Sequence, residues 1–161
     1  MGTSRYFLSL GSNLGDRENN LKMAVEFLSA EGIRIVSASS LYETEPVGIT
    51  TEAWFFNQVL EVETRLNPEA LLHLLKRIEE QLGRVHTECP KSRPIDIDIL
   101  LAGEKTVNSR DLKIPHSRMT ERNFVLIPLA EIAPDAQHPV LKKKIKDLLE
   151  KSKDRSRVKK L

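Results

Sequence analysis

The sequence predicts an α+β protein with a ferredoxin-like βαββαβ core, an antiparallel sheet with helices packed on it. Two patterns favour this fold. Four short segments have alternating or β-rich apolar residues, as half-buried strands do. Two longer segments repeat their apolar residues every three or four positions, as on one face of a helix. The order strand, helix, strand, strand, helix, strand is that of the split βαβ arrangement, with the helices on one face of the sheet.

The four expected strands are short and are separated by turn-forming residues. They cover Arg5–Leu10, Ile33–Tyr42, Phe55–Thr64 and Ile95–Leu101. Gly11–Gly15 is a turn-forming cluster that ends the first strand. A loop with Pro46 and Gly48 separates the second strand from the third.

Two main helices have clear start and stop signals. Asp16 is a suitable N-cap for a helix to about Ala30, and Gly32 ends it. Asn67-Pro68-Glu69 combines a capping side chain, a proline at the first helical position and an early acid, and Gly83 stops this second helix. Beyond Lys113, shorter helices are expected near Phe124–Ile132 and Leu141–Leu149.

Length and composition indicate one globular domain over residues 1–161, with no repeat or linker. No apolar run approaches the roughly 20 residues that span a bilayer, so no membrane association is expected. The single cysteine, Cys89, suits a reducing compartment. We therefore expect a cytoplasmic protein. No obvious apolar surface demands a partner, so we expect a monomer.

The C-terminal region is strongly basic from about residue 140. Residues 140–161 carry ten Lys or Arg and three Asp or Glu. Such a tail can reach phosphates or nucleic acid, or it can be a solvated helix followed by a frayed end. No aromatic residue for base stacking follows Leu149. We therefore favour the solvated interpretation, with no nucleic-acid binding and a tail that is dispensable for chemistry.

The most informative pattern is the alternation of acids and isoleucines in the fourth strand. Because side chains alternate between faces, Asp96 and Asp98 share one face, with Cα atoms roughly 7 Å apart. Such a pair suits Mg²⁺, which binds carboxylates and polyphosphate oxygens together, and two metal ions could share it. The pattern also fits an amphipathic strand whose acids only face water.

Basic residues around this strand favour the functional interpretation. Arg84 and Arg93 flank the loop before it, His116 follows a turn-forming proline, and Arg122 lies shortly after. Guanidinium groups match phosphate oxygens and stay charged at any working pH. Acids beside several arginines suit phosphoryl-type transfer, in which catalysis is mostly positioning and charge stabilisation.

Six short motifs, from about Tyr6 to Pro139 and in the same order, resemble the 6-hydroxymethyl-7,8-dihydropterin pyrophosphokinase family. They are Leu8–Asp16 with Asn20-Leu21, Ser40–Gly48, Phe55–Asn57, Arg77–Glu79 with Gly83-Arg84, Arg93 with Asp96–Leu100, and Ile114–His116. Each motif is weak alone, but six in order make a chance resemblance very improbable. The resemblance implies pyrophosphoryl transfer from ATP to a hydroxymethyl-pterin, a step of folate biosynthesis.

The resemblance also implies roles for individual residues. Asp96 and Asp98 would hold two Mg²⁺ ions, and Arg84 and Arg93 would stabilise the transferring group as catalytic residues. The residues implied in ATP binding are Lys76, Glu79, Arg84, Arg93, Ile99, Lys113, His116 and Arg122. The residues implied in pterin binding are Thr44, Val47, Phe55, Asn57 and Phe124. Phe55 and Phe124 would sandwich the flat ring, and Asn57 would read its amide-like edge.

The chain departs from the family pattern in places. Glu45 stands where proline is usual, and Cys89–Ser92 replaces a segment that commonly contains an aromatic residue.

Two other classes of protein share parts of this pattern. A ferredoxin-like RNA-binding module would need paired exposed aromatics on the sheet, which the strands lack. A catalytically silent ligand-binding domain would not need both Asp96 and Asp98 together with both arginines.

Overall fold

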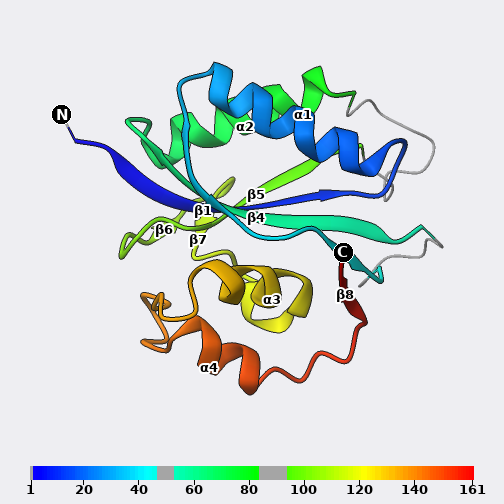
Figure 1. The fold of residues 1–161 in the computed structure, drawn as a ribbon. Helices are drawn as coiled ribbons and strands as arrows, with labels where there is room; N and C mark the ends of the chain where they lie inside the picture. The colour runs from blue at the N-terminus through cyan, green and yellow to red at the C-terminus, as the bar shows by residue number, and fades with distance from the viewer. Residues whose placement is uncertain (1, 47–52, 84–93) are drawn as a thin grey trace.

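A computed structural model describes residues 2–46, 53–83 and 94–161. The elements in chain order are β1 (Ser4–Ser12), α1 (Arg17–Ala30), β2 (Arg34–Ala38), β3 (Tyr42–Thr44), β4 (Phe55–Thr64), α2 (Pro68–Gln81), β5 (Asp96–Leu101), β6 (Val107–Asn108), β7 (Lys113–Ile114), the 3₁₀ helix η1 (Met119–Glu121), α3 (Asn123–Ile132), α4 (Ile145–Glu150) and β8 (Val158–Lys160). The predicted βαββαβ order is confirmed (Figure 1).

The main sheet is antiparallel and has the strand order β5-β1-β4-β3-β8, with β2 also paired to β4. The long strands β1 and β4 form its centre, and β1 pairs with β4 on one side and β5 on the other. A separate two-stranded sheet, β6-β7, lies beside β5.

Both long helices begin at the predicted caps. The backbone N–H of Asn19 donates to Asp16 Oδ1 at 3.1 Å, and that of Ala70 donates to Asn67 Oδ1 at 2.8 Å. Each bond satisfies an amide that the first helical turn leaves without a partner. Gly32 and Gly83 follow the two helices with φ of +82° and +96°, a backbone conformation that glycine adopts without strain.

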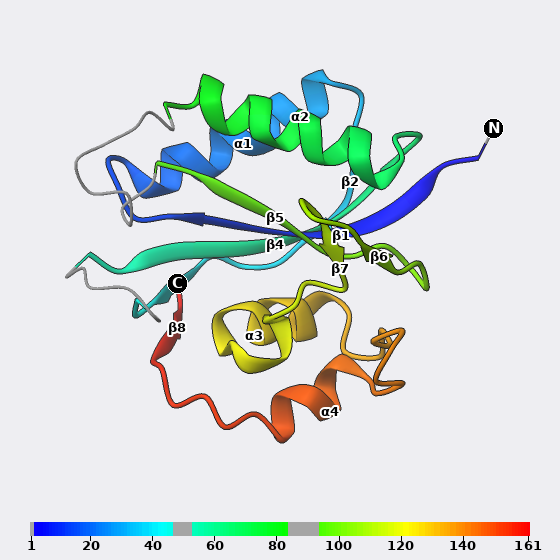
Figure 2. The same ribbon diagram turned by 180° about the vertical axis from the view of Figure 1, so that it is seen from behind.

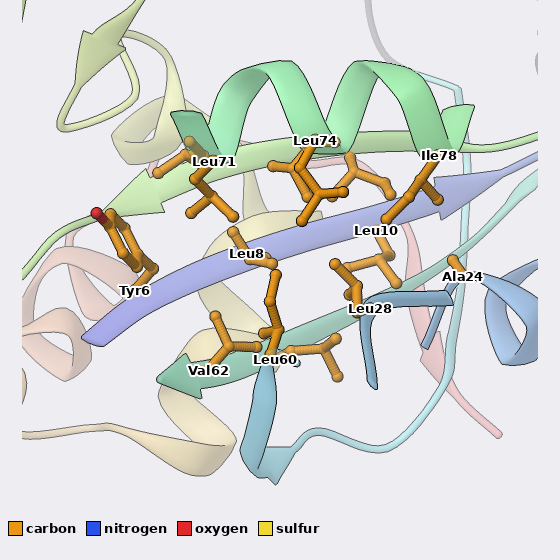
Figure 3. Close-up of a cluster of buried hydrophobic side chains, with 14 of the residues drawn as sticks. Tyr6, Leu8, Leu10, Ala24, Leu28, Leu60, Val62, Leu71, Leu74 and Ile78 are labelled. Carbon is orange, nitrogen blue, oxygen red and sulfur yellow. The ribbon is translucent and has the colours of Figure 1, made fainter. Parts of the chain in front are cut away.

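A first hydrophobic core lies between the sheet and helices α1 and α2. Figure 3 shows Leu8 and Leu10 of β1 beneath Leu71 and Ile78 of α2. All four side chains are fully buried. Burying a leucine or isoleucine contributes about 1.5–3 kcal/mol, so this layer fixes the position of β1 and β5 under α2.

The two core helices, α1 and α2, pack on one face of the sheet as expected, and two further helices, α3 and α4, cover the other face. Figure 2 shows α1 and α2 on one side of the sheet and α3 and α4 on the other. A second core joins Val59 of β4 and Leu100 of β5 to Leu126 and Leu129 of α3. The apolar residues of segment 124–132 could not be assigned to a face from their periodicity because the helix is apolar nearly all round.

The expected second strand, Ile33–Tyr42, is divided into β2 and β3. The hydroxyl of Ser39 accepts the backbone N–H of Val59 at 2.9 Å, while Ser39 N donates to Val59 O at 2.8 Å. The Ser39 hydroxyl therefore accepts a hydrogen bond from β4 that a backbone carbonyl of the neighbouring strand would normally accept. The strand is interrupted there and resumes at Tyr42.

The expected helix over Leu141–Leu149 is shorter and begins later, at Ile145. The Nδ1 atom of His138 accepts the backbone N–H groups of Val140 and Leu141 at 3.2 and 3.1 Å. These bonds fix a turn in place of a first helical turn. Lys142 follows with φ of +57°, outside the helical region.

The C-terminal segment is ordered, which corrects the expectation of a solvated helix followed by a frayed end. Residues Val158–Lys160 form β8, which pairs with β3. Without β8, the three-residue strand β3 would be an edge strand with unpaired backbone groups on its outer side, and β8 supplies hydrogen-bond partners for them.

Within residues 2–46, 53–83 and 94–161, no helix is long and apolar enough to span a membrane.

Candidate active site

The two carboxylates of β5 lie where the alternation predicted. Asp96 pairs with Gly11 of β1, and Asp98 pairs with Ser9. Both acids are partly exposed, while Ile97 and Ile99 are buried in the first core. Leu100, two positions after Asp98, packs in the second core, so the acids point to the face that carries α3.

The alternation ends at an irregularity in the β1–β5 pairing. Phe7 pairs with Leu101 but Leu8 pairs with Ile99, so Leu100 is an extra residue in β5. Leu100 and Leu101 both pack in the second core as a result. The Leu100 carbonyl accepts the backbone N–H of His116 at 3.0 Å, which places this histidine beside the acids.

His116 has a defined orientation at this site. Its Nδ1 atom accepts the backbone N–H of Arg118 at 3.2 Å, and its Nε2 atom lies 4.0 Å from Asp98 Oδ2. Burial lowers the pKa of His116, and the charges of Arg122 and Arg118 lower it further, against the opposing effect of Asp96. The ring is therefore neutral near pH 7. With Nδ1 accepting, the proton is on Nε2, which faces the acids as a donor.

A cavity of about 210 Å³ opens beside these residues. Its lining includes Asp98, Ile99, Lys113 and His116, four of the residues implied in metal or ATP binding. The remaining lining residues are Leu72, Ile97, Asp111, Leu112 and Ser117. The cavity lies at β5, the outer strand of the main sheet, next to β7.

A second group of predicted residues lies on the same face, two strands away. Asn57 of β4 pairs with Gly11, which in turn pairs with Asp96, so the three residues form one row across the sheet. The side-chain amide of Asn57 donates to the hydroxyl of Thr44 in β3. Both side chains are buried, at 4% and 1% exposure.

Gly11 provides the space that Asn57 occupies. A Cβ atom at Gly11 would lie 2.7 Å from Asn57 Oδ1 and 3.7 Å from Phe55 Cδ2. The amide of Asn57 and the ring of Phe55 therefore both approach the bare backbone of β1. Phe55 is partly exposed, as a ring that receives a ligand must be.

Phe124 and Arg122 stand at the start of α3, on the same side of the sheet. The guanidinium of Arg122 lies 5.5 Å from the centre of the Phe124 ring. Phe124 is partly buried and packs against the second core. The charge of Arg122 also lowers the pKa of His116, so the start of α3 contributes to the electrostatics of the acidic side of the site.

Comparison with known proteins decides the family. The sequence model of 7,8-dihydro-6-hydroxymethylpterin-pyrophosphokinase (HPPK) matches residues 7–134. The chain belongs to the HPPK family. Two bacterial relatives support this assignment, both named 2-amino-4-hydroxy-6-hydroxymethyldihydropteridine pyrophosphokinase. The Bacillus subtilis protein is 43% identical over 81% of this chain and 79% of its own length. The Methylorubrum extorquens protein is 46% identical over 82% of this chain and 84% of its own.

Longer relatives match this chain over part of their own length. The folic acid synthesis protein fol1 of Pneumocystis carinii is 44% identical over 92% of this chain, which spans 20% of that protein. Among solved structures, an HPPK-DHPS protein in complex with substrates superposes with a TM-score of 0.77 at 16% identity. It matches 93% of this chain and 43% of its own length, and this likeness supports the ferredoxin-like fold.

The donor atoms of this HPPK chain fit Mg²⁺ bound together with a nucleotide. Asp96 and Asp98 offer partly exposed carboxylate oxygens on one face, the hard donors that Mg²⁺ prefers. Among the residues that the structure describes, no group of three or more His, Cys, Asp or Glu could hold a metal by itself. The remaining ligands would then be water and substrate phosphates, which is how Mg²⁺ is usually bound at nucleotide sites.

Five predicted site residues are not among the side chains described above. Arg84, Arg93 and Val47 lie outside the described residues, so their roles stay predictions. Lys76 is exposed on α2. Glu79 is 3% exposed, and its Oε2 accepts the backbone N–H of Ile97 at 2.8 Å, a bond that holds β5 against α2.

Sequence reasoning gave no individual role to Gly11 or Tyr42. A glycine within a strand is a recognised sign of close approach by another group, so Gly11 could have been singled out. Tyr42 pairs with Asn57, and its hydroxyl donates to Glu131 of α3 at 2.7 Å. Burial and this hydrogen bond raise the pKa of Tyr42 to about 12, so the hydroxyl remains a donor. The sequence carries no signal for this contact, because the two residues are 89 positions apart.

Proposed function

We propose that this HPPK chain transfers a pyrophosphoryl group from ATP to 6-hydroxymethyl-7,8-dihydropterin, giving AMP and the pterin pyrophosphate. The hydroxymethyl oxygen would attack the β-phosphorus, the bond between the α- and β-phosphates would break, and the hydroxyl proton would be lost to solvent. The carrying observation is the row Asn57–Gly11–Asp96. Asn57, which is suited to reading a heterocycle, lies on one side of β1. Asp96, which is suited to holding a metal–phosphate group, lies on the other side.

On the phosphate side, we propose that Asp96 and Asp98 hold two Mg²⁺ ions with ATP. When bound, these ions would neutralise charge on the reacting phosphates. The neutral His116 would donate from Nε2 to a phosphate oxygen, because its other nitrogen is engaged by Arg118. The guanidinium of Arg122 suits a phosphate contact, because its planar donors match phosphate oxygens. The cavity beside Ile99 and Lys113 would receive the nucleotide base.

On the pterin side, the bond to Thr44 fixes the amide of Asn57. Because Nδ2 donates to the Thr44 hydroxyl, Oδ1 is the atom directed over Gly11. An acceptor at this place suits the amino and N–H groups on the amide-like edge of a pterin. Phe55 and Phe124 are the aromatic residues proposed to stack on the two faces of the ring. Val47 is proposed to complete this pocket.

The transfer step itself would use Arg84 and Arg93, which we propose as the groups that stabilise charge on the moving pyrophosphoryl group. Lys76 and Glu79 are the remaining proposed ATP contacts.

The cytoplasm is the compartment we propose, since one cysteine suits a reducing environment. We propose no partner beyond the two substrates and the metal.

The test is product analysis with purified protein, ATP, Mg²⁺ and 6-hydroxymethyl-7,8-dihydropterin. AMP and a pterin pyrophosphate are expected in equal amounts, with neither formed when the pterin is omitted. An Asp96→Asn variant should produce neither product at a comparable rate. ADP in place of AMP would show single phosphoryl transfer and contradict the proposal, as would the absence of any pterin product.

A further inference from the structure

Residues 154–160, here called the strap, cross from the end of α4 to the outer edge of the sheet. Figures 1 and 2 show this path, with β8 lying beside the end of the sheet. The family match ends at residue 134, so the strap lies outside it. The strap makes specific contacts with both parts of the proposed pterin pocket.

The first contact is at the start of α3. Asp154 Oδ2 accepts the backbone N–H of Asn123 at 2.8 Å, and the Asp154 carbonyl accepts the Asn123 side-chain amide at 3.1 Å. The side chain of Arg122, the residue before this helix, makes no capping hydrogen bond. Asp154 therefore acts as the N-cap from a distant part of the chain, where a negative charge is favourable. Asn123 lies between Arg122 and Phe124, so the cap fixes the backbone that carries both.

The second contact is at the connection between β3 and β4. Glu45 N donates to the Arg157 carbonyl at 3.0 Å, and Arg157 N donates to Glu45 Oε1 at 3.0 Å. The Arg157 guanidinium lies 3.6 Å from Glu45 Oε2 and 4.9 Å from the centre of the Trp54 ring. Glu45 directly follows Thr44, and Trp54 directly precedes Phe55. A proline at position 45 could not donate the first of these bonds.

The third contact is the pairing of β8 with β3. Val158 pairs with Thr44, and Lys160 pairs with Tyr42. The three-residue strand β3 is therefore held between β4 and β8, and Thr44 stays in place to accept from Asn57. Glu131 already ties the far end of α3 to this region through Tyr42. The strap ties the near end, where Phe124 lies.

We infer that the strap positions the pterin pocket, with Asp154 and Arg157 as positioning residues that fix Phe124 relative to Thr44 and Phe55. The inference rests on the proposed function. Residues of the pocket come from two separate parts of the fold, α3 and the β3–β4 end of the sheet. A flat ring held between two aromatic side chains needs their separation to be fixed, because stacking depends on close contact. The strap contacts both parts beside those residues.

The test uses full-length Asp154→Ala, Arg157→Ala and the double variant. Arg155→Ala is the matched control, because Arg155 is an exposed arginine of the same segment. The double variant is expected to raise the pterin KM about tenfold and each single variant a few-fold. The kcat, and the affinity for a non-hydrolysable ATP analogue with Mg²⁺, should stay within about twofold. Arg157→Lys, which keeps the charge beside Glu45 and Trp54, should recover much of the loss.

Several outcomes would overturn the inference. One is an unchanged pterin KM with a lowered melting temperature, since the strap would then only stabilise the fold. Equal losses of pterin and ATP affinity would likewise indicate general loosening. Hydrogen exchange provides a readout without substrate: the amides of Asn123 and Glu45 should lose protection in the double variant and keep it in Arg155→Ala. This readout is independent of activity. If the wild-type protein formed no AMP but the double variant still lost protection, the proposed function would fail while the contacts of the strap would be supported.

Discussion

The side-chain oxygen of Asn57 lies over the α-carbon of Gly11, so close that a Cβ atom at position 11 would come within 2.7 Å of it. The two residues face each other across the β1–β4 pair at the centre of the sheet. The absence of a side chain at one position therefore permits the placement of the other. Phe55 shares the same space, so a change at Gly11 affects two residues of the proposed pterin pocket at once.

Gly11→Ala should impair pterin binding more than folding. The new methyl group must displace the Asn57 amide, which is itself held by Thr44. We expect the pterin KM to rise at least about tenfold, because a site built to hydrogen-bond a ligand loses heavily when a polar group is misplaced. ATP affinity, measured by calorimetry with a non-hydrolysable analogue, should change little.

The double variant Gly11→Ala with Asn57→Ser serves as the control for this clash. Removing the amide relieves the steric conflict, so the melting temperature should recover while pterin binding should not. If Gly11→Ala bound pterin normally, the pocket would lie elsewhere than over β1.

Asp96→Asn and Asp98→Asn should each lower the rate of transfer by at least about 100-fold while the protein remains folded. Loss of a charge that holds the metal–phosphate group removes several kcal/mol of transition-state stabilisation. Asp111→Asn is the matched control, because Asp111 lines the same cavity but is not on β5. Steady-state rates over a range of Mg²⁺ concentrations provide the measurement. A large defect in Asp111→Asn with a normal Asp98→Asn would reassign the metal site.

Much of this geometry could be predicted from local sequence. The alternation around Asp96 and Asp98 determines which residues share a face, because the side-chain period of a strand is two. Asp16 and Asn67 were recognisable as helix caps for a similarly local reason. The contacts of Glu131 with Tyr42 and of Asp154 with Asn123 span 89 and 31 positions. No short-range pattern specifies such pairs, so neither the second core nor the strap could be predicted.

Glu79→Ala should destabilise the fold by about 1–3 kcal/mol. The buried N–H of Ile97 would lose its acceptor, and an unsatisfied buried donor costs its desolvation free energy. Lys76→Ala, an exposed change on the same helix, should shift stability by less than about 0.5 kcal/mol. Chemical denaturation measures both.

Glu79→Gln separates the structural role of Glu79 from its proposed contact with ATP. The amide oxygen can still accept from Ile97, so most of the stability should be retained. A strong loss of ATP affinity in this folded variant would place the carboxylate at the nucleotide, whereas normal affinity would assign Glu79 to holding β5.

Stability should fall as the pH drops through the range just below 6.5, before the carboxylates titrate. Burial lowers the pKa of both His138 and His116 in the folded protein relative to their ordinary value of 6.5. The unfolded chain therefore binds more protons in this range, so the free energy of unfolding rises with pH and is lost on acidification. At His138, protonation of Nδ1 would also remove the acceptor for Val140 N and Leu141 N.

His138→Asn isolates this contribution. An asparagine oxygen can accept the same two backbone N–H groups but does not titrate, so the turn before α4 should be preserved at all pH values. Melting temperatures of wild type and variant, measured from pH 7.5 to 5.5, should diverge as the pH falls, with the variant losing less. His116 still titrates in the variant, so part of the decline should persist. His73→Gln, a change at an exposed histidine of α2, should follow the wild-type curve. Parallel curves for wild type and His138→Asn would show that the protonation of His138 is not coupled to folding.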